Sequence, residues 1–307
     1  MKPFRFGVQV HTAPSPSGWR SMARRIEELG YSSLLIPDHF GDQYGPLVAL
    51  AVAAEATSTL RVGSLVFGND YRHPVVLAKE IATLELLSNG RVEFGLGAGW
   101  MSSDYDEAGL TYAAPGERVS RMAESLIILK QLWGDGTSSF QGDHYTTEKA
   151  QGLPRLTKNP QIVIGGGSPR VLGIAAREAD IVGVNPNLAA GRIGREVIES
   201  TQAEYFDERI GWIREAAGSR FDSIELQILT NIVQITDDRD TAISGLASLM
   251  GVTDEQVAHT PIALIGSVDQ IVETLIERRE RYGFSYVVVH EPEIESFAPV
   301  VAALNGL

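Results

Sequence analysis

The chain has 307 residues, and 44% of them are hydrophobic, which is enough to bury a large core in one α/β barrel with insertions or in two small domains. The formal net charge of -13 argues against nucleic acid or an anionic membrane as a partner. The absence of cysteine excludes disulfides, thiolate metal sites and thiol nucleophiles.

The first residues lead directly into a strand-like run at 4–10, with no charged segment before a long apolar core. No run of 18 or more apolar residues occurs in the sequence. We therefore expect a cytoplasmic protein that acts on a small molecule, without nucleic acid or membrane as a partner.

Strand-like and helix-like segments alternate along the chain. Apolar and β-branched runs predict eight strands, and apolar residues at helical spacing predict the helices between them. In chain order we expect a strand at 4–10, a helix at 19–29, a strand at 32–36, a helix at 46–58, a strand at 60–67, a helix between His73 and Gly90, a strand at 91–96, a helix at 117–133, a strand at 161–164, a helix at 169–178, a strand at 180–184, a helix at 203–216, a strand at 223–235 that can bend near Thr230-Asn231, helical pieces at 238–250 and 253–258, a helix at 268–282, a strand at 284–289 and a helix at 294–304.

This alternation predicts one (β/α)8 TIM barrel over residues 1–307, with insertions after strands 4, 6 and 7. A doubly wound open sheet is the main alternative, because alternation alone cannot show that a sheet closes. In a barrel, chemistry belongs at the opening formed by the carboxyl ends of the strands, which we call the mouth. The residues expected there are His11, Asp38, His39, Asn69, Asp70, Trp100, the run 165–168, Asn185, His290 and Glu291.

The most informative stretch runs from residue 61 to residue 100. A buried strand closes at Gly68-Asn69-Asp70, a helix opens at His73-Pro74, and the next strand ends in GLGAGW. In this last run the missing side chains leave the backbone open to a ligand, and Trp100 offers a flat face.

The order of GSLVFGNDYRHP, LAKEIATLELLSNGR and GLGAGW resembles the luciferase-like flavin and deazaflavin oxidoreductases, in particular the branch that uses coenzyme F420. The resemblance extends over nearly the whole chain. It implies a TIM barrel, coenzyme F420 with FMN as the alternative, hydride transfer between C5 of the deazaflavin and a small organic substrate, and a homodimer.

Asp38 and His39 follow the second predicted strand in the sequence PDHF. A carboxylate beside an imidazole can fix its tautomer and raise its pKa, so that the imidazole exchanges a proton near neutral pH. PDHF matches the motif with which deazaflavin-dependent sugar-phosphate dehydrogenases contact the deazaflavin ring. The resemblance makes His39 the best catalytic candidate, oriented by Asp38. The alternative is a turn cap followed by a solvated loop histidine.

A glycine run precedes the helix at 169–178. Its successive amides can turn toward one point, and a serine followed by proline suits the first positions of a helix, whose dipole favours an anion. Arg170 could add a positive charge. The loop follows strand five, whereas barrels commonly bind phosphate after strands seven and eight, and a turn without a ligand is the alternative. By the resemblance, the residues that hold the cofactor's phosphate are Gly165, Gly166, Gly167 and Ser168.

The resemblance also implies a cis peptide bond at Leu65-Val66 beneath the cofactor ring, with an ordinary buried strand as the alternative. Gly97 and Ala98 are expected to contact the cofactor. Where sugar-phosphate dehydrogenases have a glutamate directly after their glycine run, this chain has Trp100. Their proton-donating acid is therefore missing, so their substrate is not implied, and Trp100 is expected to wall the ring or the substrate.

His11 and His290 are expected to line the substrate pocket, with a structural role as the alternative, because no motif marks them. Residues 95–99 read GxGxG and precede a loop, so a Rossmann nicotinamide site is a weak match. No metal is expected, because the sequence after the first strand lacks the second histidine of a metal-dependent barrel hydrolase. The functions that stay open are an FMN-dependent monooxygenase and a protein that binds F420 or flavin without turnover.

Overall fold

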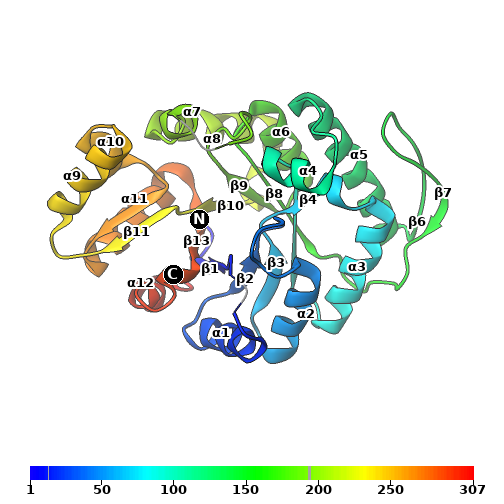
Figure 1. The fold of residues 1–307 in the computed structure, drawn as a ribbon, viewed down its shortest axis with the longest axis horizontal. Coiled ribbons are helices and arrows are strands. Elements are labelled where there is room, and N and C mark those ends of the chain that lie inside the picture. Colours follow the sequence, from blue (N-terminus) through cyan, green and yellow to red (C-terminus); the bar gives the residue numbers. More distant parts are fainter. Residues whose placement is uncertain (13, 193–194) are drawn as a thin grey trace.

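A closed barrel of eight parallel strands forms the centre of the protein (Figure 1). The computed structural model describes residues 1–12, 14–192 and 195–307. The barrel is closed because its third and fourth strands pair with each other, so the expected TIM barrel is confirmed and the open sheet is wrong. Its strands, in chain order, are β1 (Arg5–Gln9), β2 (Ser33–Ile36), β3 (Arg61–Ser64), β5 (Val92–Gly97), β8 (Gln161–Gly166), β9 (Ile181–Val184), β10 (Glu225–Leu229) and β13 (Phe284–His290).

Helices surround this barrel and bury their apolar faces against the outward side chains of the strands. Six of them have a proline in the first turn, where the missing amide hydrogen costs no hydrogen bond. The surrounding helices are α1 (Pro16–Glu28), α2 (Pro46–Ala56), α3 (Pro74–Leu87), α5 (Pro115–Gly134), α6 (Pro169–Glu178), α8 (Ala203–Ala217), α11 (Val268–Tyr282) and α12 (Ala298–Leu304).

Insertions follow strands 4, 6 and 7 of the barrel, as expected. The first contains α4 (Ser102–Ala108), and the second contains α7 (Arg195–Glu199). A hairpin of β6 (Thr137–Gln141) and β7 (Thr146–Gln151) follows α5 and projects from the side opposite the third insertion (Figure 1). The third insertion contains β11 (Ile232–Ile235), α9 (Arg239–Met250), α10 (Asp254–His259) and β12 (Ala263–Gly266).

The expected seventh strand at 223–235 is wrong in extent. Its first part is β10, and its second part, β11, leaves the barrel and pairs with β12, a strand that the sequence did not predict. The chain turns at Thr230, where the amide (2.8 Å) and the hydroxyl (2.9 Å) both donate to the carbonyl of Val288. The amide of Asn231 then donates to the carbonyl of Ile262, which starts the second sheet.

The expected strand at 60–67 also divides, into β3 and the short β4 (Phe67–Gly68). A cis peptide bond joins Leu65 and Val66 between them, as the resemblance implied. Glycines on β5 make room for this segment. A Cβ at Gly95 would lie 1.9 Å from the carbonyl oxygen of Ser64, and one at Gly97 would lie 2.5 Å from Cγ2 of Val66. Part of the glycine pattern in GLGAGW is therefore explained by packing against the cis peptide.

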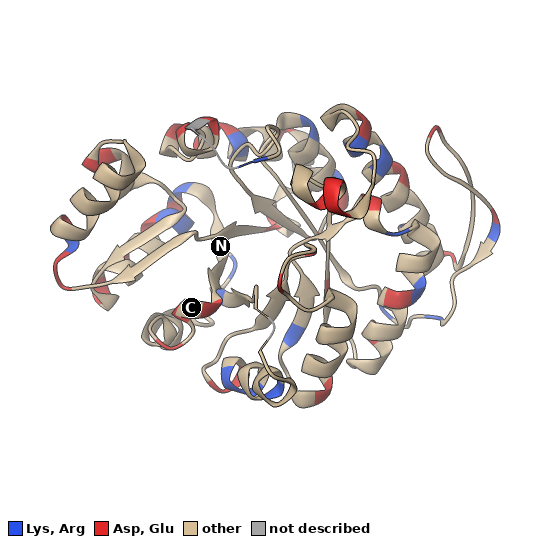
Figure 2. Cartoon of the chain, in the orientation of Figure 1, with Lys and Arg blue, Asp and Glu red and all other residues tan. Residues whose placement is uncertain are grey.

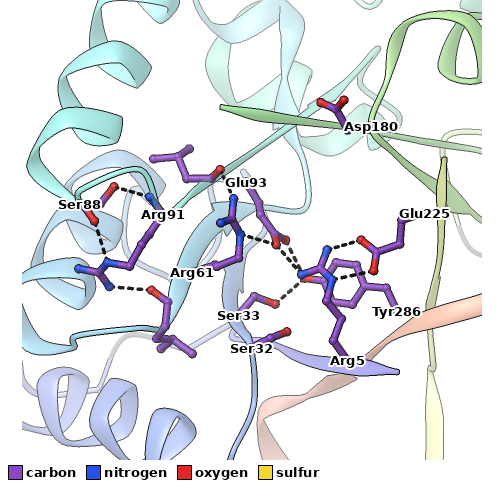
Figure 3. A network of polar contacts seen from close by, with 12 residues as sticks. Arg5, Ser32, Ser33, Arg61, Ser88, Arg91, Glu93, Asp180, Glu225 and Tyr286 are labelled. Atoms are coloured by element: carbon purple, nitrogen blue, oxygen red, sulfur yellow. Dashed lines mark hydrogen bonds and ion pairs between the residues drawn. The ribbon is translucent and has the colours of Figure 1, made fainter. Parts of the chain in front are cut away.

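A neutral polar network fills the barrel interior at the end opposite the mouth (Figure 3). The fully buried Glu93 accepts hydrogen bonds from Arg5 Nη1 (2.5 Å), Arg61 Nε (2.9 Å) and the hydroxyl of Tyr286 (2.8 Å). Arg5 also donates to Glu225 through Nε (2.8 Å) and Nη2 (2.6 Å). Two arginines thus balance two glutamates, as buried charges require.

The remaining charged residues of both signs are spread over the outer helices and the connecting loops (Figure 2). Within the described part of the chain, no helix has the length and apolar character needed to cross a bilayer.

Candidate functional site

The mouth brings together four of the residues expected there, from four different strand ends. His11 follows β1, His39 follows β2, Trp100 follows β5, and His290 ends β13. The rings of His39 and Trp100 meet edge to face, with centroids 6.0 Å apart. His11 and His290 are hydrogen-bonded to each other. The sequence-based expectation that these side chains share one opening is met.

His39 is held by a buried carboxylate. Its Nδ1 lies 2.6 Å from Oδ2 of Asp104, on α4, and the hydroxyl of Tyr71 donates to the same oxygen at 3.1 Å. The Asp104 side chain is 5% exposed and that of His39 is 26% exposed. No described residue bonds Nε2 of His39. An imidazole fixed at Nδ1 with Nε2 open can give or take a proton there.

The expectation that Asp38 orients His39 is wrong. Asp38 is buried and accepts two hydrogen bonds from Arg72, at 2.5 Å from Nη1 and 3.0 Å from Nη2, and a third from the amide of Gly68 at 3.0 Å. Successive side chains at the end of an extended strand point in opposite directions, so the two neighbours face different elements. Asp38 faces the segment after β4, whereas His39 faces α4.

Asp104 was not among the expected site residues, because the sequence SSDYDEA predicts no helix. This segment is short and polar and has no apolar stripe, so periodicity could not reveal it. One signal was present: Gly109 ends α4 in the left-handed conformation, at φ 66°, where glycine is favoured.

Asp70 is a further buried carboxylate near the mouth. Asp70 Oδ2 accepts a hydrogen bond from the hydroxyl of Tyr105 at 3.0 Å and pairs with Arg121 Nη1 at 2.9 Å. Burial, with Asp104 beside Tyr71 and Asp70 beside Tyr105, raises the pKa of both phenols. Both tyrosines therefore stay protonated and act as fixed hydrogen-bond donors to the two carboxylates.

The imidazoles of His11 and His290 form a pair across the neighbouring strands β1 and β13. His11 Nε2 lies 2.8 Å from His290 Nδ1, and the ring centroids are 4.9 Å apart. Burial is the main cause that lowers the pKa of His290, to about 4, and it also lowers the pKa of His11. The charge of His39 contributes to the shift of His11, so all three imidazoles lie within electrostatic reach of one another.

The glycine loop ends β8 and begins α6. The N-cap hydroxyl of Ser168 accepts a hydrogen bond from the amide of Val171 at 3.5 Å. A Cβ at Gly167 would lie 2.3 Å from the carbonyl oxygen of Pro186 and 2.6 Å from that of Asn185. Close packing against the next strand end therefore explains Gly167 without a ligand.

The same loop also has the features of an anion site. No described residue accepts a hydrogen bond from the amides of Gly167, Ser168 or Arg170, which precede or begin α6. Arg209 Nε donates to the carbonyl of Gly167 at 3.3 Å and places a positive charge behind the loop. The guanidinium of Arg170 donates to Gly116 O at 2.8 Å, beside α5, and a contribution of its charge to the loop stays a prediction.

These features fit an aromatic cofactor that carries a phosphate. The unpaired amides suit the phosphate, and the backbone of Gly97 and Ala98 lies at the mouth beside the cis peptide. In the turn that follows β4, Asn69 Oδ1 is buried and has no hydrogen-bond partner among the described residues. The described part of the chain contains no group of three or more histidine or acidic side chains placed to hold a metal ion.

Comparison with known proteins identifies the family. A model described as luciferase-like monooxygenase matches residues 1–210. The F420-dependent glucose-6-phosphate dehydrogenase of Amycolatopsis mediterranei is 32% identical over 166 residues, which cover 52% of this chain and only 50% of that protein. The protein of the same name from Intrasporangium calvum is 26% identical over an alignment that covers 92% of this chain and 93% of its own.

The fold is shared with a solved structure, the coenzyme F420 dependent tetrahydromethanopterin reductase from Methanopyrus kandleri. The TM-score is 0.78 at 21% identity, over 99% of this chain and 98% of the other. The family model covers more than half of the chain, its fold is the one observed here, and this protein therefore belongs to the luciferase-like monooxygenase family.

Proposed function

We propose that this protein is an oxidoreductase that uses coenzyme F420 and transfers a hydride between C5 of the deazaflavin and a small organic substrate at the mouth. The observation that carries the proposal is the His39–Asp104 pair, which faces the mouth beside Trp100. The names of the curated relatives support the choice of cofactor.

F420, when bound, supplies the hydride chemistry. The chain supplies position and proton transfer. His39 holds or releases a proton at Nε2, and Asp104 fixes the ring through Nδ1. Trp100 walls the site and excludes water from one side. In this proposal Asp38 does not touch the proton, but anchors Arg72 and the amide of Gly68 close to the cis peptide.

The cofactor contacts follow the same geometry. The segment Leu65-Val66 and the backbone of Gly97 and Ala98 would support the ring. The unpaired amides at the start of α6 would bind the phosphate. We assign this role to the amides of Gly167, Ser168 and Arg170, whereas Gly165 and Gly166, which the sequence also suggested, lie in β8 and pair with β9.

The test is a fluorimetric titration of the purified protein with three chromophores: F420, the deazaflavin chromophore without its phosphate, and FMN. F420 is expected to bind in a saturable manner, and removal of the phosphate should weaken binding by about tenfold or more, because charge-assisted hydrogen bonds are each worth about 1.5–3 kcal/mol. Equal affinity for F420 and for the chromophore without phosphate would show that the glycine loop does not bind the phosphate. If F420 does not bind, the proposed function is wrong.

The second candidate is an FMN-dependent monooxygenase, because the description of the matching family names a monooxygenase and the name of one curated relative includes FMNH(2). It predicts that reduced FMN bound to the protein reacts with oxygen, and that hydrogen peroxide or a hydroxylated product accumulates. A binding protein without turnover would titrate with F420 but reduce no substrate. F420 titration, substrate reduction and the reaction of reduced FMN with oxygen, measured on one purified sample, distinguish the three functions.

We further propose that the protein is a cytoplasmic homodimer that associates through the outer faces of α2 and α3. These adjacent helices expose Val48 (76%), Val76 (52%) and Leu87 (69%), which a monomer would leave in water. The mass of one chain is 33.3 kDa. Size-exclusion chromatography with light scattering should give about twice this mass for the wild type, and the mass of a single chain for Val48→Glu. A wild-type monomer contradicts this arrangement.

A further inference from the structure

Arg209, on α8, is a buried cation that no acidic side chain of the described residues balances. Only 3% of its surface is exposed, and its two hydrogen bonds go to backbone carbonyls. Burial is the main cause that lowers its pKa, and the carboxylate that opposes this shift belongs to the exposed Glu208 beside it in the chain. A buried charge normally has a partner of opposite sign, as Arg5 has in Glu93. The charge of Arg209 is therefore available to an anion that the protein binds.

The guanidinium of Arg209 is fixed directly behind the glycine loop. Its Nε donates to the carbonyl of Gly167 at 3.3 Å, and its Nη1 donates to the carbonyl of Ser200 at 2.9 Å. The guanidinium carbon also lies 5.2 Å from the centroid of the Phe206 ring, one turn away on α8. No described residue accepts a hydrogen bond from Nη2. The side chain is thus held toward the loop and away from solvent.

The peptide that joins Gly167 and Ser168 connects this charge to the other side of the loop. The peptide is trans, since the cis bonds of the described chain lie at 65–66 and 153–154. In a trans peptide the carbonyl oxygen and the amide hydrogen point in opposite directions. Arg209 lies on the carbonyl side, so the unpaired amide of Ser168 points away from it. A charged hydrogen bond to the carbonyl polarises the peptide and makes its amide a stronger donor.

From these contacts, and resting on the proposed function, we propose that Arg209 is a positioning residue of the phosphate site. It polarises the Gly167–Ser168 peptide and supplies, through it, the positive charge that the phosphate of F420 needs. Arg209 does not itself touch the phosphate. A purely structural role, in which Arg209 only ties the loop to the segment at Ser200, makes a different prediction, because it affects every ligand of the mouth alike.

The experiment measures two dissociation constants by fluorimetric titration of the full-length protein, one for F420 and one for the deazaflavin chromophore without its phosphate. The second constant divided by the first gives the contribution of the phosphate. Arg209→Met keeps a long side chain but removes the charge and both hydrogen bonds, and should lower this ratio by about fivefold or more. The constant for the chromophore without phosphate should stay within about twofold of the wild type, which also shows that the variant is folded.

Two further variants separate charge from packing. Arg209→Lys keeps the positive charge and should hold the ratio within about threefold of the wild type. Arg209→Gln retains an amide donor for the carbonyl of Gly167 but no charge, so it should also lower the ratio, and it serves if Arg209→Met folds poorly. The matched control is Arg214→Met, an exposed arginine on the same helix, which should leave both dissociation constants unchanged.

The amide of Ser168 offers a direct readout. In ¹H–¹⁵N spectra of the wild type, F420 should shift the Ser168 signal further than the chromophore without phosphate does. In Arg209→Met the shift caused by F420 should be smaller, because the peptide is no longer polarised from its carbonyl side.

The proposal is overturned if the ratio in the methionine and glutamine variants stays within about twofold of the wild type. It is also overturned if both dissociation constants rise by the same factor, since that result is the signature of the structural role. Failure of the wild type to bind F420 would instead count against the proposed function. The two failures are distinguishable, because an incorrect role for Arg209 leaves the wild-type preference for F420 over the chromophore without phosphate intact.

Discussion

At the scale of single residues, two carboxylates near the mouth have separate tasks. Asp104 holds the imidazole of His39, and Asp38 holds the guanidinium of Arg72. Both carboxylates are buried, and each is hydrogen-bonded to its partner, as buried polar groups require. In the proposed mechanism the His39–Asp104 pair takes part in proton transfer. The Arg72–Asp38 pair instead holds the backbone at Gly68 in place.

The role of Asp104 is tested by Asp104→Asn. The variant loses the charge that anchors Nδ1, so His39 should spend less time with Nε2 directed at the substrate. We expect kcat to fall by about 10- to 100-fold, the effect of a misplaced catalytic group, while F420 affinity changes little. The matched control is Asp106→Asn, an exposed aspartate on the same helix. Equal kcat for the two variants would contradict the role.

The histidine pair predicts a dependence of stability on pH. The pKa of His290 is lowered from 6.5 to about 4 in the folded protein. Between these values the unfolded chain binds a proton that the folded protein does not, so the free energy of unfolding should fall as the pH falls from 6.5 to about 4. Urea unfolding at several pH values measures this slope.

His290→Gln removes the titrating group and should make that slope shallower than in the wild type, whereas His259→Gln should leave it unchanged. His11 remains in the variant, so part of the dependence should persist. A slope that is the same in all three proteins would show that His290 is protonated equally in the folded and unfolded chain.

At the scale of elements, the glycine loop and α6 act as one unit. A Cβ at Gly167 would meet backbone oxygens of residues 185 and 186, and these cannot move without the strand end. Gly167→Ala should therefore lower both the stability and the affinity for F420. Gly211→Ala on the exposed side of α8 meets no atom within 4 Å and should instead stabilise the protein by about 0.5–1 kcal/mol. Thermal unfolding and F420 titration measure both effects.

Elements with a clear period were predictable from the sequence, and those defined by long-range contacts were not. The helices that begin with proline and the strands with continuous apolar runs, such as β8 and β13, were found because local chemistry specifies them. A bend near Thr230-Asn231 was expected within one strand, but the departure of β11 from the barrel was not, since it depends on Thr230 meeting Val288, 58 positions along the chain. The same reason applies to His39 and Asp104, which are 65 positions apart.

At the scale of the whole molecule, the barrel interior separates a stable end from a reactive end. The polar network around Glu93 closes one end (Figure 3). The histidines and Trp100 surround the other end. Residue types at both ends were visible in the sequence, but their pairing depends on closure of the sheet, which no local pattern specifies. That residues 1–307 unfold as one domain stays a prediction.

Glu93→Gln tests how far this network stabilises the barrel. Glu93 lies on β5 and joins β1, β3 and β13 through Arg5, Arg61 and Tyr286, so it connects strands on opposite sides of the barrel. The variant leaves one partly buried arginine without a balancing charge, which should lower the free energy of unfolding by about 3 kcal/mol. Glu55→Gln, exposed on α2, should change it by no more than about 0.5 kcal/mol.

Urea unfolding followed by circular dichroism measures the free energy of unfolding of both variants. The F420 affinity of both variants should be unchanged, because the network lies at the end opposite the mouth. A loss of less than about 1 kcal/mol for Glu93→Gln would mean that the apolar layers alone hold the barrel closed.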